Sequence, residues 1–188
     1  MLYFVHGAFT VGRNMDLLTA ALQARGHRTA DVDYGWTHLL NVRGITKAAA
    51  KVFASLAKPG SVAIGHSNGC NVIHKAAQQG ARFSRVIYIS PALDRDLLTS
   101  GQHVQRMDVL HTRHDGWVKL ARFIPWSIWG DMGAYGSSHP PAVIANKRYS
   151  PRKLVVKNYD CSDLIDGHSA WFGKINWLAG LIDRILKT

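Results

Sequence analysis

The chain has 188 residues, 47% of them hydrophobic and 19% charged, which is enough for one sizeable core and too little for two comfortable domains. No apolar run approaches the roughly 20 residues of a membrane span, and the first residues lack the basic leader and cleavage site of a signal peptide. The two cysteines, Cys70 and Cys161, make no disulfide framework, and neither lies in a CxxC pair. We therefore expect one cytoplasmic domain over residues 1–188.

The charge balance is strongly basic. Lys and Arg number 23 against 12 acidic residues, which gives a formal net charge of +11. All of the acidic residues are Asp, because the sequence contains no Glu. This excludes chemistry that depends on Glu, such as that of the HExxH zinc proteases and of glycosidases with paired Glu residues. Any carboxylate that works in a site must be an Asp.

Apolar runs alternate with helical patterns along the chain. Strands are predicted at residues 2–5, 29–34, 61–65, 85–90, 105–111 and 154–157. Helices are predicted between Asn14 and Gly26 and over residues 44–57, 68–79 and 170–186. Strands separated by helices favour repeated βα units, so we expect a three-layer α/β/α sandwich around a mostly parallel sheet of about six strands.

Residues 125–151 break this alternation. The segment contains Trp126, Trp129 and several Gly and Pro residues, and it shows no clear period. A loop of this length is typical of a lid or an ordered binding loop, and its Trp residues would then cover an apolar part of a ligand. The alternative is a packed irregular excursion whose Trp residues complete the core.

The segment Gly65-His66-Ser67-Asn68-Gly69 matches the pattern GxSxG. It follows a predicted strand directly and opens a helix of small residues, which is the setting that a nucleophile elbow needs. The sharp turn imposes strained backbone angles on the serine and leaves it at a helix N-terminus, where the dipole favours negative charge. The pattern therefore indicates a nucleophilic Ser67; the alternative is a Gly-rich βα turn without chemistry.

With this motif and with His6-Gly7 after the first strand, the chain resembles the α/β-hydrolase superfamily over nearly its whole length. The resemblance implies that Ser67 is the nucleophile. It also implies an oxyanion hole made by the backbone N–H groups of Ala8 and Asn68, with Phe9 as the alternative to Ala8. Since the first predicted strand begins at residue 2, we expect a minimal, six-stranded member without the two strands that usually precede the oxyanion loop.

In this superfamily the triad follows the order Ser, acid, His. Asp115 comes a few residues after a predicted strand, where the family carries its acid, and Asp94, after the preceding strand, is the runner-up. His168 lies between the last strand and the last helix, the usual place of the base. His139 belongs to the irregular segment and is the less favoured base.

The resemblance implies a serine hydrolase that cleaves carboxylic ester or thioester bonds through an acyl-enzyme, with no metal and no organic cofactor. An amidase, a peptidase or an acyltransferase would use the same triad, and a binding or scaffold protein with an unused triad is the alternative of another class. Side chains expected near the substrate are Phe9, His66, Trp117, Trp126 and Trp129.

Basic residues form two groups. Arg43, Lys47 and Lys51 recur every four residues on one face of a predicted helix. The second group is Lys147, Arg148, Arg152, Lys153 and Lys157. Solubility accounts for either group alone, but together with the net charge they indicate an anionic partner, such as an ester on an acidic glycan, a phospholipid or a nucleotide. Nucleic acid is disfavoured because no binding motif is present.

Overall fold

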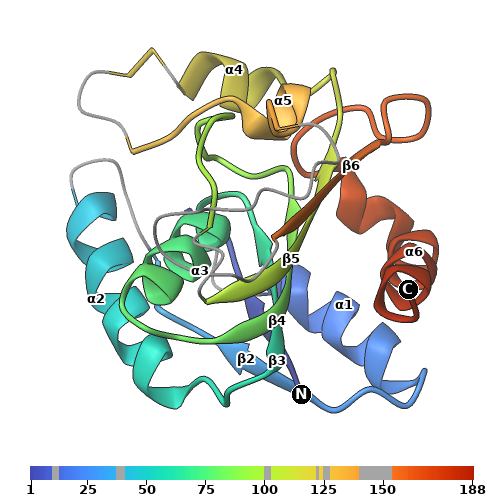
Figure 1. The fold of residues 1–188 in the computed structure, drawn as a ribbon. Coiled ribbons are helices and arrows are strands. Elements are labelled where there is room, and N and C mark those ends of the chain that lie inside the picture. The colour runs from blue at the N-terminus through green and yellow to red at the C-terminus, as the bar shows by residue number, and fades with distance from the viewer. Residues whose placement is uncertain (10–12, 37–40, 100–102, 122, 125–127, 140–153) are drawn as a thin grey trace.

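Six strands, all parallel to their neighbours, form one sheet in the computed structural model, which describes residues 1–9, 13–36, 41–99, 103–121, 123–124, 128–139 and 154–188 (Figure 1). The strand order is β2-β1-β3-β4-β5-β6. The strands are β1 (Leu2–Val5), β2 (Thr29–Val32), β3 (Ser61–His66), β4 (Phe83–Ile89), β5 (Val104–His111) and β6 (Val155–Asp160).

Helices cover both faces of the sheet. Two of them, α2 (Val42–Leu56) and α3 (Asn68–Gln78), pack on one face, and α1 (Arg13–Gln23) and α6 (Ile175–Leu186) pack on the other (Figure 1). The remaining helices are the short α4 (Gly116–Ala121) and α5 (Met132–Tyr135) and the 3₁₀ helix η1 (Ala170–Lys174). The predicted three-layer α/β/α sandwich is confirmed.

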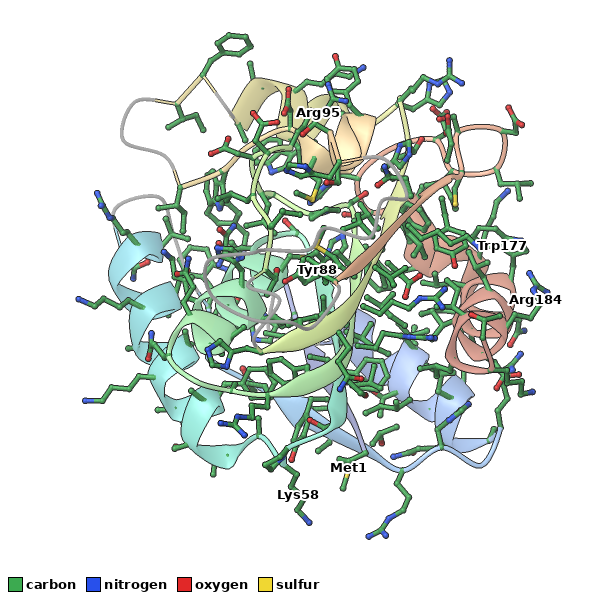
Figure 2. The ribbon with its side chains drawn as sticks, in the orientation of Figure 1. Met1, Lys58, Tyr88, Arg95, Trp177 and Arg184 are labelled. Carbon is green, nitrogen blue, oxygen red and sulfur yellow. The ribbon has the colours of Figure 1, made fainter. Side chains whose placement is uncertain are left out.

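Alternation along the strands fills the two cores. Tyr3 and Val5 of β1 pack with α2 and α3, whereas Leu2 and Phe4 pack with α1 and α6. In Figure 2, Tyr88 of β4 lies inside the protein, where it is fully buried, while the exposed Lys58 and Arg184 extend from the surface. A strand with apolar side chains on both faces reads as a continuous apolar run, which is why the pattern predicts these strands so well.

The last helix differs from its prediction. Residues 170–186 were expected to form one helix, but η1 ends at Lys174, whose backbone angles of φ −123° and ψ 42° leave the helical region before α6 begins. The short helices α4 and α5 were not predicted, because one or two turns are too few to display an apolar period. Both lie beyond the carboxyl ends of the strands (Figure 1).

The glycines of the GxSxG motif allow α3 to approach the sheet. A Cβ atom on Gly69 would lie 2.2 Å from the carbonyl oxygen of Val5 and 2.5 Å from that of His6. A Cβ atom on Gly65 would lie 2.7 Å from Cδ1 of Ile73. The start of α3 therefore touches the end of β1 directly, which brings Ser67 next to the loop that follows His6.

The described part of the irregular segment is packed. Trp129, Met132 and Ala134 are buried, and the N–H groups of Met132 and Gly133 donate to the carbonyl oxygens of Leu93 and Pro91 at 2.9 and 2.8 Å. Residues 125–127 and 140–153, and with them Trp126, Lys147, Arg148, Arg152 and Lys153, lie outside the described residues. A lid in this segment stays a prediction.

Both cysteines are free and buried. Within the described part of the chain, no helix combines the length and the apolar character needed to cross a membrane.

Candidate active site

Ser67 occupies a sharp turn between β3 and α3. Its backbone angles are φ 53° and ψ −121°, a conformation that is strained for any residue with a Cβ. The turn is held in place because the Ser67 N–H donates to the carbonyl oxygen of Ile89 at 3.0 Å, and the Ser67 carbonyl accepts from the N–H of Cys70 at 3.1 Å. This strand, strained serine and helix have the local geometry of a nucleophile elbow.

Asp115 and His168 are in contact. From the sequence they were paired only through the resemblance to the α/β-hydrolase superfamily. Nδ1 of His168 lies 2.8 Å from Oδ2 of Asp115, and the Asp115 side chain is fully buried. Its other oxygen, Oδ1, accepts the N–H of Val118 at 3.1 Å in the first turn of α4. Because a carboxylate only accepts, the proton of the His168 ring lies on Nδ1, and Nε2 keeps a lone pair that can accept a proton.

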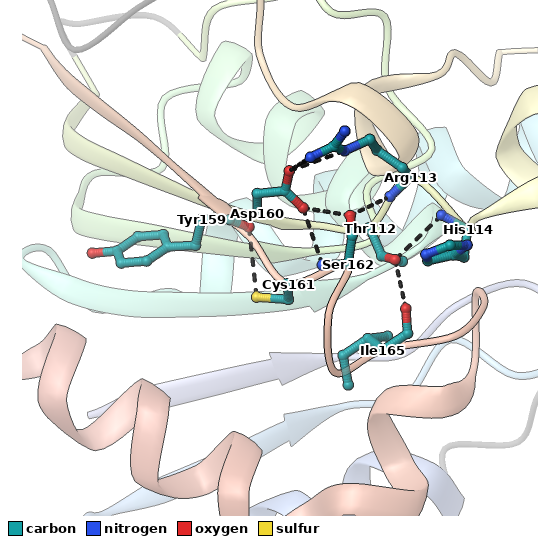
Figure 3. A network of polar contacts seen from close by, with 8 residues as sticks. All are labelled: Thr112, Arg113, His114, Tyr159, Asp160, Cys161, Ser162 and Ile165. Atoms are coloured by element: carbon teal, nitrogen blue, oxygen red, sulfur yellow. Dashed lines mark hydrogen bonds and ion pairs between the residues drawn. The ribbon is translucent and has the colours of Figure 1, made fainter.

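The loops that carry Asp115 and His168 are tied together at the ends of β5 and β6 (Figure 3). The Thr112 hydroxyl donates to the carbonyl oxygen of Ile165 at 2.6 Å. Arg113 forms an ion pair with Asp160 at 3.1 Å. Hydrogen bonds from Ser162, and then from Arg113, lower the pKa of Asp160 to about 2. These contacts join the loop that carries Asp115 to the end of β6 and to the segment that precedes His168.

Ser67 and His168 line the same cavity, which has a volume of about 600 Å³. Its other lining residues are the small or aliphatic Ala8, Ala92, Val118 and Ala121, the aromatic Phe9, Trp117 and Trp129, and the polar His66 and Ser169. Phe9, His66, Trp117 and Trp129 were the side chains expected near a substrate; Trp126, the fifth, falls outside the described residues. The described lining contains no Lys, Arg or Asp.

The loop after β1 is positioned by His6. Nδ1 of His6 lies 2.7 Å from the carbonyl oxygen of Gly7, and since a carbonyl only accepts, the ring donates. The Gly7 carbonyl and the Ala8 N–H belong to one trans peptide group, so holding the first also orients the second. Asn68 is the first residue of α3, where the N–H has no acceptor within the helix. Ala8 and Asn68 thus remain the candidate oxyanion donors. The alternative to Ala8 is Phe9, whose backbone has a positive φ of 59°.

The Asn68 side chain connects three parts of the chain, which sequence reasoning missed. Its amide nitrogen donates to the Thr46 hydroxyl at 3.0 Å and to the Tyr34 hydroxyl at 3.3 Å. Its oxygen accepts the indole N–H of Trp129 at 3.1 Å. Asn68, the residue after Ser67, therefore holds Trp129 in the wall of the cavity, and no sequence pattern indicates this because the partners are distant along the chain.

The runner-up residues lie elsewhere. Asp94 is exposed and lines a separate cavity with Asp96 and Asp131. The His139 ring bonds to the carbonyl oxygen of Asp96 at 3.1 Å. Neither residue lines the cavity that contains Ser67.

Ser67, Asp115 and His168 follow three different strands, β3, β5 and β6. The described residues contain no group of three or more His, Cys or Asp side chains that could hold a metal ion. What the arrangement offers instead is a strained serine, a histidine with a lone pair on Nε2 and a buried carboxylate behind it. This set suits nucleophilic catalysis with a general base.

No protein-family model and no curated protein matches the sequence. Solved structures do match. The mouse α/β hydrolase domain-containing protein 10 is 13% identical with a TM-score of 0.60 over 99% of this chain and 89% of that one. Carboxylesterase CesB from Bacillus subtilis is 13% identical with a TM-score of 0.56, over 98% and 82% of the two chains. A putative hydrolase of the α/β superfamily from Xanthomonas campestris pv. campestris is 17% identical with a TM-score of 0.55, over 97% and 98%.

These similarities extend over 97 to 99% of the chain. The protein has the α/β-hydrolase fold. Its sheet contains six described strands, and β1 leads directly into the loop at His6.

Proposed function

We propose that the protein is a serine hydrolase that cleaves carboxylic esters through an acyl-enzyme on Ser67. The observation that carries this proposal is the placement of a strained Ser67 in the same cavity as His168, whose Nδ1 lies 2.8 Å from the buried Asp115. The hydroxyl of a serine is a weak nucleophile by itself, so a general base and the group that orients this base must lie close by.

The reaction follows from these positions. Nε2 of His168 takes the proton of Ser67 as Oγ attacks the ester carbonyl carbon, and Asp115 stabilises the imidazolium that forms. The Ala8 and Asn68 N–H groups hold the oxyanion. The bond to the leaving oxygen then breaks, and the alcohol departs with the proton from His168. Water, deprotonated by the same ring, hydrolyses the acyl-enzyme and releases the acid.

The cavity favours a neutral, apolar acyl group. Its described walls are mostly apolar or aromatic and carry no Lys, Arg or Asp, and burying a charge there without a partner would be unfavourable.

An anionic part of a substrate, or an anionic partner, would bind outside the cavity, where the exposed Arg43, Lys47 and Lys51 of α2 offer positive charge. The structural similarity to a carboxylesterase supports an ester over an amide. Transfer of the acyl group to an acceptor other than water would use the same machinery.

Labelling with a fluorophosphonate tests the nucleophile. We expect the probe to form an adduct on Ser67, located by mass spectrometry of the digested protein, and to react much more slowly with a His168→Ala variant because the base is lost. An adduct on another serine, or none on folded wild-type protein, contradicts the proposal.

Cavity size provides a test of the acyl site. Ala121 is buried in α4 and lines the cavity, so Ala121→Leu should fill part of it. We expect kcat/KM for p-nitrophenyl octanoate to fall roughly 10-fold relative to that for the acetate, because part of the longer chain loses its binding volume. The neighbouring Leu120 is 64% exposed, so Leu120→Ala should leave the ratio unchanged. An unchanged ratio in Ala121→Leu would place the acyl group elsewhere.

A further inference from the structure

The base of the site lies on an irregular loop. His168 follows β6 and precedes η1, and the residue before it, Gly167, has a φ of 121°. Apart from Gly167 itself and its two chain neighbours, no described heavy atom lies within 4 Å of the position that a Cβ would take on Gly167. A glycine adopts this φ without steric cost. The contact within the loop is a long hydrogen bond of 3.4 Å from the Ala170 N–H to the Gly167 carbonyl oxygen. Contacts from outside the loop therefore contribute to the position of His168.

One such contact comes from the residue before the nucleophile. Nε2 of His66 lies 3.1 Å from the backbone carbonyl oxygen of His168. Because a carbonyl oxygen only accepts, His66 donates, and its proton lies on Nε2. His66 is the last residue of β3, so the strand end that positions Ser67 also holds the backbone of the base. The contact joins residues 102 positions apart in the sequence.

The His66 ring is itself held in one orientation. The side chain is 4% exposed, and its ring packs edge to face with Phe172 at a centroid distance of 4.9 Å. Its opposite edge is covered by Gly7, where a Cβ atom would lie 3.3 Å from Nδ1. A donor held from several sides loses little further freedom when it forms its hydrogen bond. The His66 ring can therefore hold the carbonyl group of His168 in one position.

The charge state of His66 suits this position. Burial, and then the neighbouring His168, lower the pKa of His66 to about 3. The ring is neutral at neutral pH, and its centroid is 4.9 Å from that of His168. A neutral neighbour does not oppose the imidazolium that must form on His168 during the reaction, whereas a cation would.

A second anchor holds an earlier part of the same loop. The bond from Thr112 fastens Ile165 at 2.6 Å, but Gly167 lies between Ile165 and His168, so this bond does not fix the base itself. We propose that His66 is a positioning residue: its hydrogen bond to the His168 carbonyl sets the place and direction of the His168 ring relative to Ser67. This role rests on the proposed function.

Two variants of matched shape separate the hydrogen bond from the packing. Met and Gln have side chains of the same length, and only Gln carries an amide N–H that can replace the Nε2–H of His66. We expect His66→Met to lower kcat for p-nitrophenyl acetate about 10- to 100-fold with KM within about twofold, because misplacement of a catalytic group affects the chemical step. His66→Gln should keep at least about a third of kcat.

Proton NMR supplies a readout that does not depend on turnover. The Nδ1 proton of His168, bonded to Asp115, should give a downfield signal that is absent in His168→Ala. We expect this signal to persist in His66→Gln and to broaden or vanish in His66→Met. Thermal unfolding identifies a variant that fails to fold; if His66→Met does, His66→Leu takes its place.

The outcomes distinguish this role from the proposed function. If the signal depends on the His66 donor but wild-type protein hydrolyses no ester, the proposed function fails and the structural role stands. If His66→Met keeps both the signal and kcat, the positioning role is overturned. Equal losses in folded His66→Met and His66→Gln would also overturn it, because the ring and not its hydrogen bond would then matter.

Discussion

Replacement of Ser67 by Ala is expected to lower kcat for ester hydrolysis at least about 10⁴-fold and to abolish fluorophosphonate labelling, because no other group would form the acyl-enzyme. The remaining rate would come from binding and from the oxyanion donors acting on water. Steady-state hydrolysis of a short p-nitrophenyl ester, compared with wild-type protein of equal folded fraction, measures the change.

Ser169 provides the matched control, since it lines the same cavity as Ser67. Ser169→Ala should retain kcat within about threefold and still be labelled, because Ser169 has an unstrained backbone (φ −107°, ψ 1°) at the start of η1 and does not occupy the strained turn between β3 and α3. Hydrolysis retained by Ser67→Ala would refute the acyl-enzyme. If wild-type and Ser67→Ala proteins bind a ligand equally and neither hydrolyses it, the alternative of a scaffold with an unused triad gains support.

Asp115→Asn should lower kcat by about 10⁴-fold while the protein stays folded. Both carboxylate oxygens of Asp115 accept hydrogen bonds, one from Val118 N–H at 3.1 Å and one from His168 Nδ1 at 2.8 Å. An Asn side chain has only one acceptor oxygen. If that oxygen keeps the bond to Val118, the amide N–H₂ faces His168 and forces the ring proton onto Nε2, where it blocks acceptance of the Ser67 proton.

Asp94→Asn is the control, because Asp94 is exposed and lies outside the cavity of Ser67. We expect its kcat and KM to equal those of the wild type, and thermal unfolding of both variants checks the fold. A large loss in Asp94→Asn with little change in Asp115→Asn would reverse the assignment of the acid.

The sheet could be predicted from the sequence because its signals are local. Leu2–Val5 is a continuous apolar run that the structure buries on both faces, and such a run indicates a central parallel strand. Ser67 could be proposed for the same reason, since the strand, the sharp turn and the helix that define the elbow are neighbours along the chain. The break at Lys174 was missed because helical periodicity continues across it.

The choice between Asp115 and Asp94 could not be made from the residues alone. Both follow a strand that ends at the same edge of the sheet, so both are candidates on topology. The contacts of Asp115 favour it over Asp94: its side chain is buried, one carboxylate oxygen accepts the Val118 N–H in the first turn of α4, and the other lies next to Nδ1 of His168.

From the sequence alone we could predict the succession of the six strands and the longer helices along the chain, the position of the serine in its sharp turn and the basic character of the chain. Each of these depends on residues that are adjacent in the sequence or on simple composition. The tertiary structure alone decided which side chains meet: His66 with His168, Thr112 with Ile165, and Asn68 with Trp129. These contacts depend on strand register and loop packing, so their geometry emerges only when distant parts of the chain are brought together.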